Sequence, residues 1–205
     1  WLRLGLAYHF RTFLSLTEEY STRIESTFKN GDEYDSASLL NRQEYVINTP
    51  SRWLVSAAFI LGKAGVVSAD YEYVNYANGQ LKPTSFADSD AYDFAAENEA
   101  LNVAYGSSHI ARVGAEFRIQ RAWRVRLGVG METSPYTDAA QVAVDATRYT
   151  ASTGWGYRSE KWYGSMTYRR SWREQDLSLS SHNLVEVGKL GNTHGMVVFA
   201  VGFRL

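Results

Sequence analysis

Arginine side chains are the groups in this chain whose spacing most clearly permits chemistry. Four of them occupy the polar positions of runs in which every second residue is apolar, and they are Arg112, Arg126, Arg148 and Arg169. A guanidinium binds a carboxylate through two parallel N–H···O hydrogen bonds, so a row of arginines could receive the acid group of a ligand. Acids occur in the same kind of run, among them Glu72, Glu116 and Glu132. The alternative is that these acids pair with the arginines in a structural network.

Catalytic and metal chemistry find little support in the sequence. The histidines are His9, His109, His182 and His194, and they lack the spacing of metal ligands. The chain contains no cysteine, which excludes a thiolate site. Serines are frequent, but nothing marks the convergent serine, histidine and acid of a hydrolase. We therefore expect no enzyme, no metal and no cofactor, and the net charge of −1 gives no reason to expect a nucleic-acid partner.

The arginines and acids named above lie in a set of eight segments, in each of which apolar residues alternate with polar or small ones. The segments are 1–10, 52–61, 66–76, 111–119, 123–132, 148–158, 162–173 and 196–205. Period two is the pattern of a β-strand with one apolar face, and about ten residues let a tilted strand cross a bilayer. The mean hydropathy of −0.32 is compatible with a membrane location, because only every second residue of such a strand meets lipid.

The connections between these segments alternate in length. Tight turns are expected at 62–65, 120–122 and 159–161, whereas polar excursions cover about 17–46, 77–108, 133–147 and 174–194. Within the second excursion, 93–105 has the apolar spacing of a short helix. Outer-membrane barrels have short periplasmic turns and long extracellular loops, so this alternation favours such a barrel over a soluble β-sandwich.

The polar face of the predicted strands carries about a dozen charges, and a charge facing lipid at the bilayer midplane costs roughly 2–4 kcal/mol. These charges, Arg204 near the end of the chain included, are therefore expected to line a lumen. Aromatic residues gather near both strand ends, for example Trp123 and Tyr71, as in interfacial belts. The sequence predicts an all-β fold, a transmembrane antiparallel up-and-down β-barrel, with 1–205 as a single domain in contact with the lipids of a bacterial outer membrane.

Glycines are frequent on the lumenal face. They are Gly114, Gly128, Gly130, Gly154, Gly156 and Gly202. One interpretation is that they clear a path for a ligand. The other, which we favour, is that they allow curvature and leave room for the long arginine side chains.

Several motifs give the chain a resemblance to a known family. They are 2–9 (LRLGLAYH), 15–21 (SLTEEYS), 49–53 (TPSRW), 65–76 (GVVSADYEYVNY), 112–118 (RVGAEFR), 134–136 (SPY) and 202–205 (GFRL). Each is weak alone, but together they cover most of the chain in the family's order. The chain resembles the FadL-type outer-membrane channels of Gram-negative bacteria, most closely the Bacteroidetes-like members, although Leu205 stands where the family typically ends on phenylalanine.

The resemblance implies a 14-stranded β-barrel plugged by an N-terminal hatch, of which this chain would be the C-terminal eight strands. It also implies passive transport of hydrophobic small molecules, such as long-chain fatty acids. In the family, the loop that corresponds to the first excursion helps to form a hydrophobic groove where substrate lands. Phe13, Leu14 and Leu16 are therefore candidate ligand contacts. Their alternative role is an outward extension of the first strand.

Two other functions stay open at this point. The eight strands could close alone into a barrel whose interior is filled with side chains, which would suit a structural or anchoring module. The chain could also be a FadL-like barrel that serves as a subunit of a larger envelope complex, with protein partners against its loops.

Overall fold

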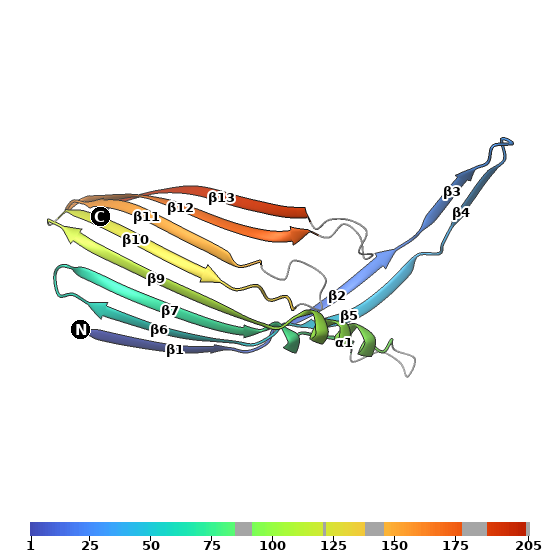
Figure 1. Ribbon diagram of the computed structural model, residues 1–205, viewed down its shortest axis with the longest axis horizontal. Helices are drawn as coiled ribbons and strands as arrows, with labels where there is room; N and C mark the ends of the chain where they lie inside the picture. The colour runs from blue at the N-terminus through green and yellow to red at the C-terminus, as the bar shows by residue number, and fades with distance from the viewer. Residues whose placement is uncertain (85–91, 121, 138–145, 178–187, 204–205) are drawn as a thin grey trace.

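Eight antiparallel strands form one sheet in the computed structural model, which describes residues 1–84, 92–120, 122–137, 146–177 and 188–203 (Figure 1). The strands are β1 (Leu2–His9), β6 (Arg52–Ile60), β7 (Gly65–Asn75), β9 (Ser107–Ile119), β10 (Trp123–Glu132), β11 (Arg148–Arg158), β12 (Trp162–Leu177) and β13 (Gly188–Phe203). Each pairs with the next of these strands along the chain, in the order β1-β6-β7-β9-β10-β11-β12-β13. The predicted fold class and all eight predicted strands are confirmed.

The two ends of this sheet differ, as the loop lengths predict. Figure 1 shows both chain termini and the tight turns at one end, and the longer connections at the other. At the first turn the Leu61 N–H donates to the Gly65 carbonyl at 2.9 Å, and Gly62 has a φ of +57° that glycine adopts without strain. Gln120 occupies the corresponding left-handed conformation at the second turn, with φ +60°.

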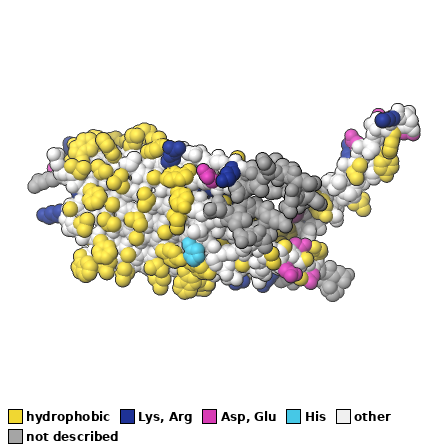
Figure 2. All heavy atoms as spheres, viewed as in Figure 1, with side chains coloured by type: hydrophobic (Ala, Val, Ile, Leu, Met, Phe, Trp, Pro, Cys, Tyr) yellow, Lys and Arg dark blue, Asp and Glu magenta, His cyan; other side chains and the backbone are white. Residues whose placement is uncertain are grey.

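Apolar side chains cover the outside of the sheet rather than a buried core (Figure 2). Leu4, Phe199 and Trp155 are 76%, 71% and 65% exposed, and each lies at an apolar position of the alternating pattern. Among the described residues, the buried apolar side chains are only Val74, Phe94 and Ala146. A soluble protein rarely exposes so continuous an apolar surface, so this arrangement suits a sheet whose outer face meets lipid. In the described part of the chain, no helix is long and apolar enough to cross a membrane.

The sequence predicts a loop for the first polar excursion, but the structure shows a long β-hairpin there. Its strands are β2 (Phe13–Tyr20), β3 (Arg23–Thr27), β4 (Glu33–Ala37) and β5 (Asn41–Asn48). β2 and β5 join β8 (Gln80–Pro83) in a three-stranded sheet, while β3 and β4 pair only with each other. We call residues 13–48 the arm, and Figure 1 shows it extending away from the eight-stranded sheet. Polar residues on both faces hide the period-two signal on which the prediction depended.

The last excursion was also predicted too long. β12 continues to Leu177 and β13 already begins at Gly188, so residues 174–177 and 188–194 of the expected loop are strand. The predicted helix over 93–105 is confirmed as α1 (Ala95–Ala104), and a single 3-10 turn, η1 (Tyr76–Asn78), precedes β8. The predictions for Arg204, Leu205 and His182 lie outside the described residues.

The eight-stranded sheet has two edges. β1 pairs with β6 and β13 pairs with β12, and in the described part of the chain β1 and β13 do not pair with each other. These eight strands therefore do not form a closed barrel in the structure, and the hypothesis of a complete eight-stranded barrel receives no support from it.

Candidate binding site on the polar face of the sheet

Ion pairs across neighbouring strands organise the polar face. Register places Glu116 of β9 directly opposite Arg126 of β10, and the Arg126 Nε donates to the Glu116 carboxylate at 2.7 Å. The other oxygen of Glu116 lies 3.4 Å from Arg124 Nε. Arg126 is thus held by the strongest ion pair on this face, as the structural-network hypothesis expects.

The other two predicted acids form longer pairs. Glu72, whose side chain is only 13% exposed, lies 3.2 Å from Arg52 and 3.7 Å from Arg112. Glu132 lies 3.4 Å from Arg148. Within the described residues, the structure records no ion pair for Arg169. The four predicted arginines are therefore not equivalent. Arg126 has the nearest acid, Arg148 and Arg112 have acids at longer distances, and Arg169 has no recorded acidic partner among the described residues.

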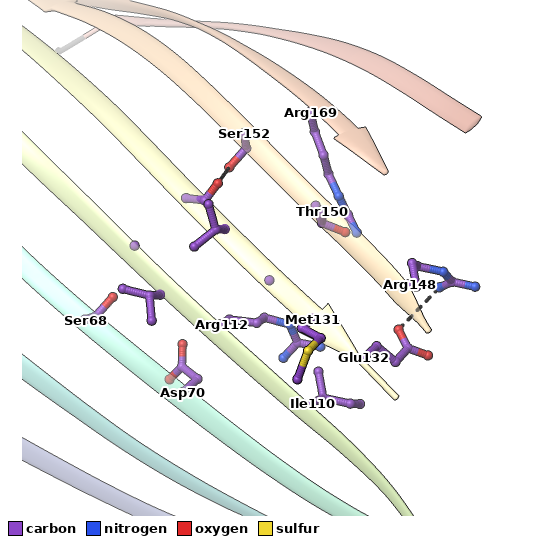
Figure 3. Close-up of a pocket in the computed structure, with 15 residues that line it drawn as sticks. Ser68, Asp70, Ile110, Arg112, Met131, Glu132, Arg148, Thr150, Ser152 and Arg169 are labelled. Atoms are coloured by element: carbon purple, nitrogen blue, oxygen red, sulfur yellow. Dashed lines mark hydrogen bonds and ion pairs between the residues drawn. The ribbon is translucent and has the colours of Figure 1, made fainter. Parts of the chain in front are cut away.

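Three of these four arginines line one cavity of about 460 Å³ (Figure 3). Arg112 comes from β9, Arg148 from β11 and Arg169 from β12. The remaining lining is mostly small or polar, including Ser68, Asp70, Thr150 and Ser152. Arg126 does not belong to this group, because it lines a separate cavity of about 260 Å³ together with Arg124. We call the larger space the arginine cavity.

Three lining residues nearby were not predicted from the sequence. Arg148 and Arg169 also line an adjoining cavity of about 420 Å³, to which Arg173, Asn192 and His194 contribute. Arg173 lies four residues after Arg169 and therefore on the same face of the strand, so the alternating pattern in the sequence is enough to place it on the polar face. The two residues of β13 were missed because the strand begins earlier than its apolar pattern does.

Glycines on this face lie beside the side chains of several arginines. A Cβ added at Gly154 would lie 3.6 Å from the Cβ of Arg126, and one added at Gly156 would lie 3.8 Å from the Cβ of Arg124. A Cβ added at Gly130 would lie 3.5 Å from the Cγ of Arg112. These are ordinary van der Waals distances, and Gly114, Gly128 and Gly130 also line the arginine cavity, so both interpretations of the glycines stay predictions.

The three apolar loop candidates lie in β2, apart from the arginine cavity. Register pairs Leu14 with Ile47 and Leu16 with Tyr45, which places Leu14 and Leu16 on one face of the arm. Phe13 lies on the opposite face, because strand side chains alternate. All three are exposed. Their location in a strand beyond β1 agrees with an outward extension, and a substrate contact at Leu14 and Leu16 stays a prediction.

Glu72, Glu116 and Glu132 are spread along this face as partners of the arginines. Within the described residues, no group of three or more His, Asp or Glu side chains is arranged to hold a metal ion. In the arginine cavity, guanidinium groups lie among polar side chains, which suits the binding of an anionic group of a ligand.

Comparison with known proteins identifies the fold. No protein-family model and no curated protein sequence matches the chain. A solved structure of a FadL homologue from Pseudomonas aeruginosa is similar, with a TM-score of 0.60 and 17% sequence identity. The match covers 98% of this chain and 48% of the solved chain, so this chain spans about half the length of that protein. At this identity the likeness establishes the fold, which is that of a FadL-like barrel wall.

Proposed function

We propose that the chain forms part of an outer-membrane channel for the passive uptake of hydrophobic small molecules, with long-chain fatty acids as the substrate class. The observation that carries the proposal is the arginine cavity, in which Arg169 has no recorded acidic partner among the described residues. The FadL-like fold and the apolar outer face support a location in the outer membrane. Fold likeness alone does not determine a substrate, so the cavity has to provide it.

The arrangement suggests two stages of binding. Leu14 and Leu16 present an apolar surface on the arm, where the alkyl chain of a ligand loses contact with water. The carboxylate then meets Arg169, with Arg112 and Arg148 close by in the same cavity. Because Arg112 and Arg148 already contact acids at 3.7 Å and 3.4 Å, Arg169 offers the most favourable charge for the ligand. Binding and release need no nucleotide and no cofactor.

Replacing Arg169 with methionine tests this assignment. Equilibrium binding of oleate and of oleyl alcohol is measured on the full-length protein in detergent micelles. Losing one charge-assisted hydrogen-bonded pair costs about 1.5–3 kcal/mol, so we expect Arg169→Met to weaken oleate binding by roughly tenfold or more. Binding of oleyl alcohol, which carries no charge, should change little.

Arg170→Met is the matched control, since Arg170 is the next residue of β12 and points to the opposite face. It should leave both affinities unchanged. Equal oleate affinity in the natural protein and in Arg169→Met would exclude the arginine cavity as the carboxylate site.

The arm supports a second candidate, a subunit of a larger envelope complex. Ile24, Phe28 and Tyr34 lie near its tip and are each close to 60% exposed, at 59%, 58% and 59%. Register places Ile24 and Tyr34 on one face of the β3–β4 pair, while Arg23 binds Asp35 through two hydrogen bonds on the other face. A two-stranded hairpin with an exposed apolar face is only marginally stable by itself in water, so a protein partner would stabilise it.

A further inference from the structure

A further cavity lies between the arm and α1, and it shares no lining residue with the arginine cavity. Its volume is about 610 Å³. Four aromatic rings contribute to its lining, and they belong to Tyr20, Tyr45, Tyr92 and Phe94. The sequence predicts none of these four as a ligand contact, and they come from β2, β5 and the segment before α1. We call this space the aromatic cavity.

Defined contacts hold the two walls of the aromatic cavity together. In the β2–β5 register, Leu16 faces Tyr45 and Tyr20 faces Asn41, so the tyrosines lie on one face of the arm. Asn98 of α1 fastens the helix to β8, since its side chain both accepts from the Leu81 N–H at 2.7 Å and donates to the Leu81 carbonyl at 2.9 Å. The cavity is therefore built by the fold rather than left between loose segments.

Phe94 anchors the aromatic wall. It is among the buried apolar residues, at 7% exposure, and its ring centroid lies 5.8 Å from that of Tyr45. The Tyr92 ring meets Phe94 edge-on at 5.0 Å. Aromatic faces carry negative electrostatic potential, so rings from both walls make the space attractive to a cation.

Two carboxylates add negative charge to the same lining. The Tyr45 hydroxyl approaches Glu18 at 3.5 Å, and the Tyr92 hydroxyl donates to Oε1 of Glu97 at 2.5 Å. The second oxygen of Glu97, Oε2, is buried and has no recorded hydrogen-bond partner in the described part of the chain. An unsatisfied buried carboxylate oxygen is costly, and a cation in the cavity would offset its negative charge through space.

The one arginine in this lining does not cancel that charge. Arg42 is bound by two acids of the arm, with distances of 2.7 Å to Glu44 and 3.9 Å to Glu19. Within the described lining, Glu18 and Glu97 have no recorded ion pair. The aromatic cavity therefore carries an excess of negative charge, in contrast to the arginine cavity.

We propose that the aromatic cavity binds organic ammonium compounds, with the charged nitrogen against the tyrosine rings and near Glu18 and Glu97. An alkyl or aryl group of the ligand would fill the apolar part formed by Phe94, Ile47 and Leu81. This site is independent of the proposed transport of acids, because its charge selects the opposite kind of ligand.

Benzyltrimethylammonium is a suitable probe, since it is cationic, aromatic and too short to form micelles. Its binding to the full-length protein in detergent is measured by isothermal titration calorimetry and by saturation-transfer NMR. We expect saturable binding, with benzenesulfonate and benzyl alcohol binding at least about tenfold more weakly because they lack the positive charge. The double variant Glu18→Gln/Glu97→Gln should weaken binding of the cation by about tenfold or more.

Glu25→Gln is the matched control, because Glu25 lies further along the arm in β3, outside the cavity lining. It should bind the cation as the natural protein does. Absence of saturable binding by the natural protein would overturn the proposal, as would equal binding of the anionic probe. Unchanged binding by the double variant would also overturn it, and Arg169→Met should leave binding of this probe unaltered.

Discussion

Gly202 and Tyr163 form a contact that only glycine permits. They lie directly opposite each other in the β12–β13 register, and the Tyr163 ring occupies the space where a Cβ at Gly202 would be. A side chain at Gly202 would therefore displace the ring or spread the two strands. An aromatic side chain that covers a glycine on a neighbouring strand also helps to fix register.

Gly202→Ala is expected to destabilise the folded protein by about 1–3 kcal/mol, the usual effect of overpacking. Gly191→Ala is the matched control, because Gly191 lies in the same strand and an added Cβ there would meet nothing within 4 Å. Urea unfolding in lipid vesicles, followed by tryptophan fluorescence, measures the difference between the two variants. Equal stabilities would show that the Tyr163 ring moves aside without cost.

Alternation assigns a side chain to a face but not to a partner. The sequence therefore places Arg126 and Arg169 on the same polar face, which the structure confirms. Whether an acid stands opposite depends on register, and register pairs Arg126 with Glu116 but places Ser152 opposite Arg169. The cross-strand partner distinguishes a structural arginine from a candidate ligand-binding one. The pattern of a single strand cannot predict that partner, because it does not specify the register with the neighbouring strand.

The strands of the eight-stranded sheet follow from the sequence much more closely than those of the arm. The tenth and eleventh strands, Trp123–Glu132 and Arg148–Arg158, have the predicted bounds. A sheet with one apolar and one polar face requires a strict alternation in such strands. The arm is mostly exposed, so a strand such as β2 can carry Ser15, Thr17 and Glu19 on one face without an apolar period.

The hydrogen bond between Tyr92, just before α1, and Glu97 of α1 affects the titration of the tyrosine. The bond to Glu97, together with the charge of that carboxylate, raises the pKa of Tyr92 above its ordinary value, because ionisation would place two anions side by side. A raised pKa in the folded state means that the bond contributes fully below the ordinary tyrosine pKa, about 10. It is lost as the pH rises through the higher folded value.

Glu97→Gln should therefore lower the pKa of Tyr92 toward the ordinary tyrosine range. NMR titration of the ¹³Cζ resonance of Tyr92 measures this change directly. Glu99→Gln provides the control, since Glu99 is an exposed residue of the same helix, and it should leave the Tyr92 titration nearly unchanged. An unaltered Tyr92 titration in Glu97→Gln would show that the hydrogen bond is not formed in solution.

The whole molecule combines an apolar exterior, a charged polar face and two sheet edges. Edge strands with free N–H and C=O groups are not tolerated in the hydrocarbon region of a membrane, because lipid cannot satisfy them. β1 and β13 must therefore be paired in a membrane, either with each other or with further strands. The open sheet and the 48% coverage of the solved FadL homologue favour further strands.

Cross-linking between engineered cysteines distinguishes these arrangements, since the natural chain contains none. Leu4→Cys is combined with Ala57→Cys, its partner on β6, or in turn with Val197→Cys, Phe199→Cys and Val201→Cys on β13. Directly opposed Cβ atoms in a sheet are about 4.5–5.5 Å apart, so a short thiol cross-linker joins only paired strands. We expect the Leu4–Ala57 link alone when the full-length protein is probed in membranes and the peptides are identified by mass spectrometry. A link from Leu4 to any of the three β13 positions would instead mean that eight strands close by themselves, with an interior too narrow for the proposed channel.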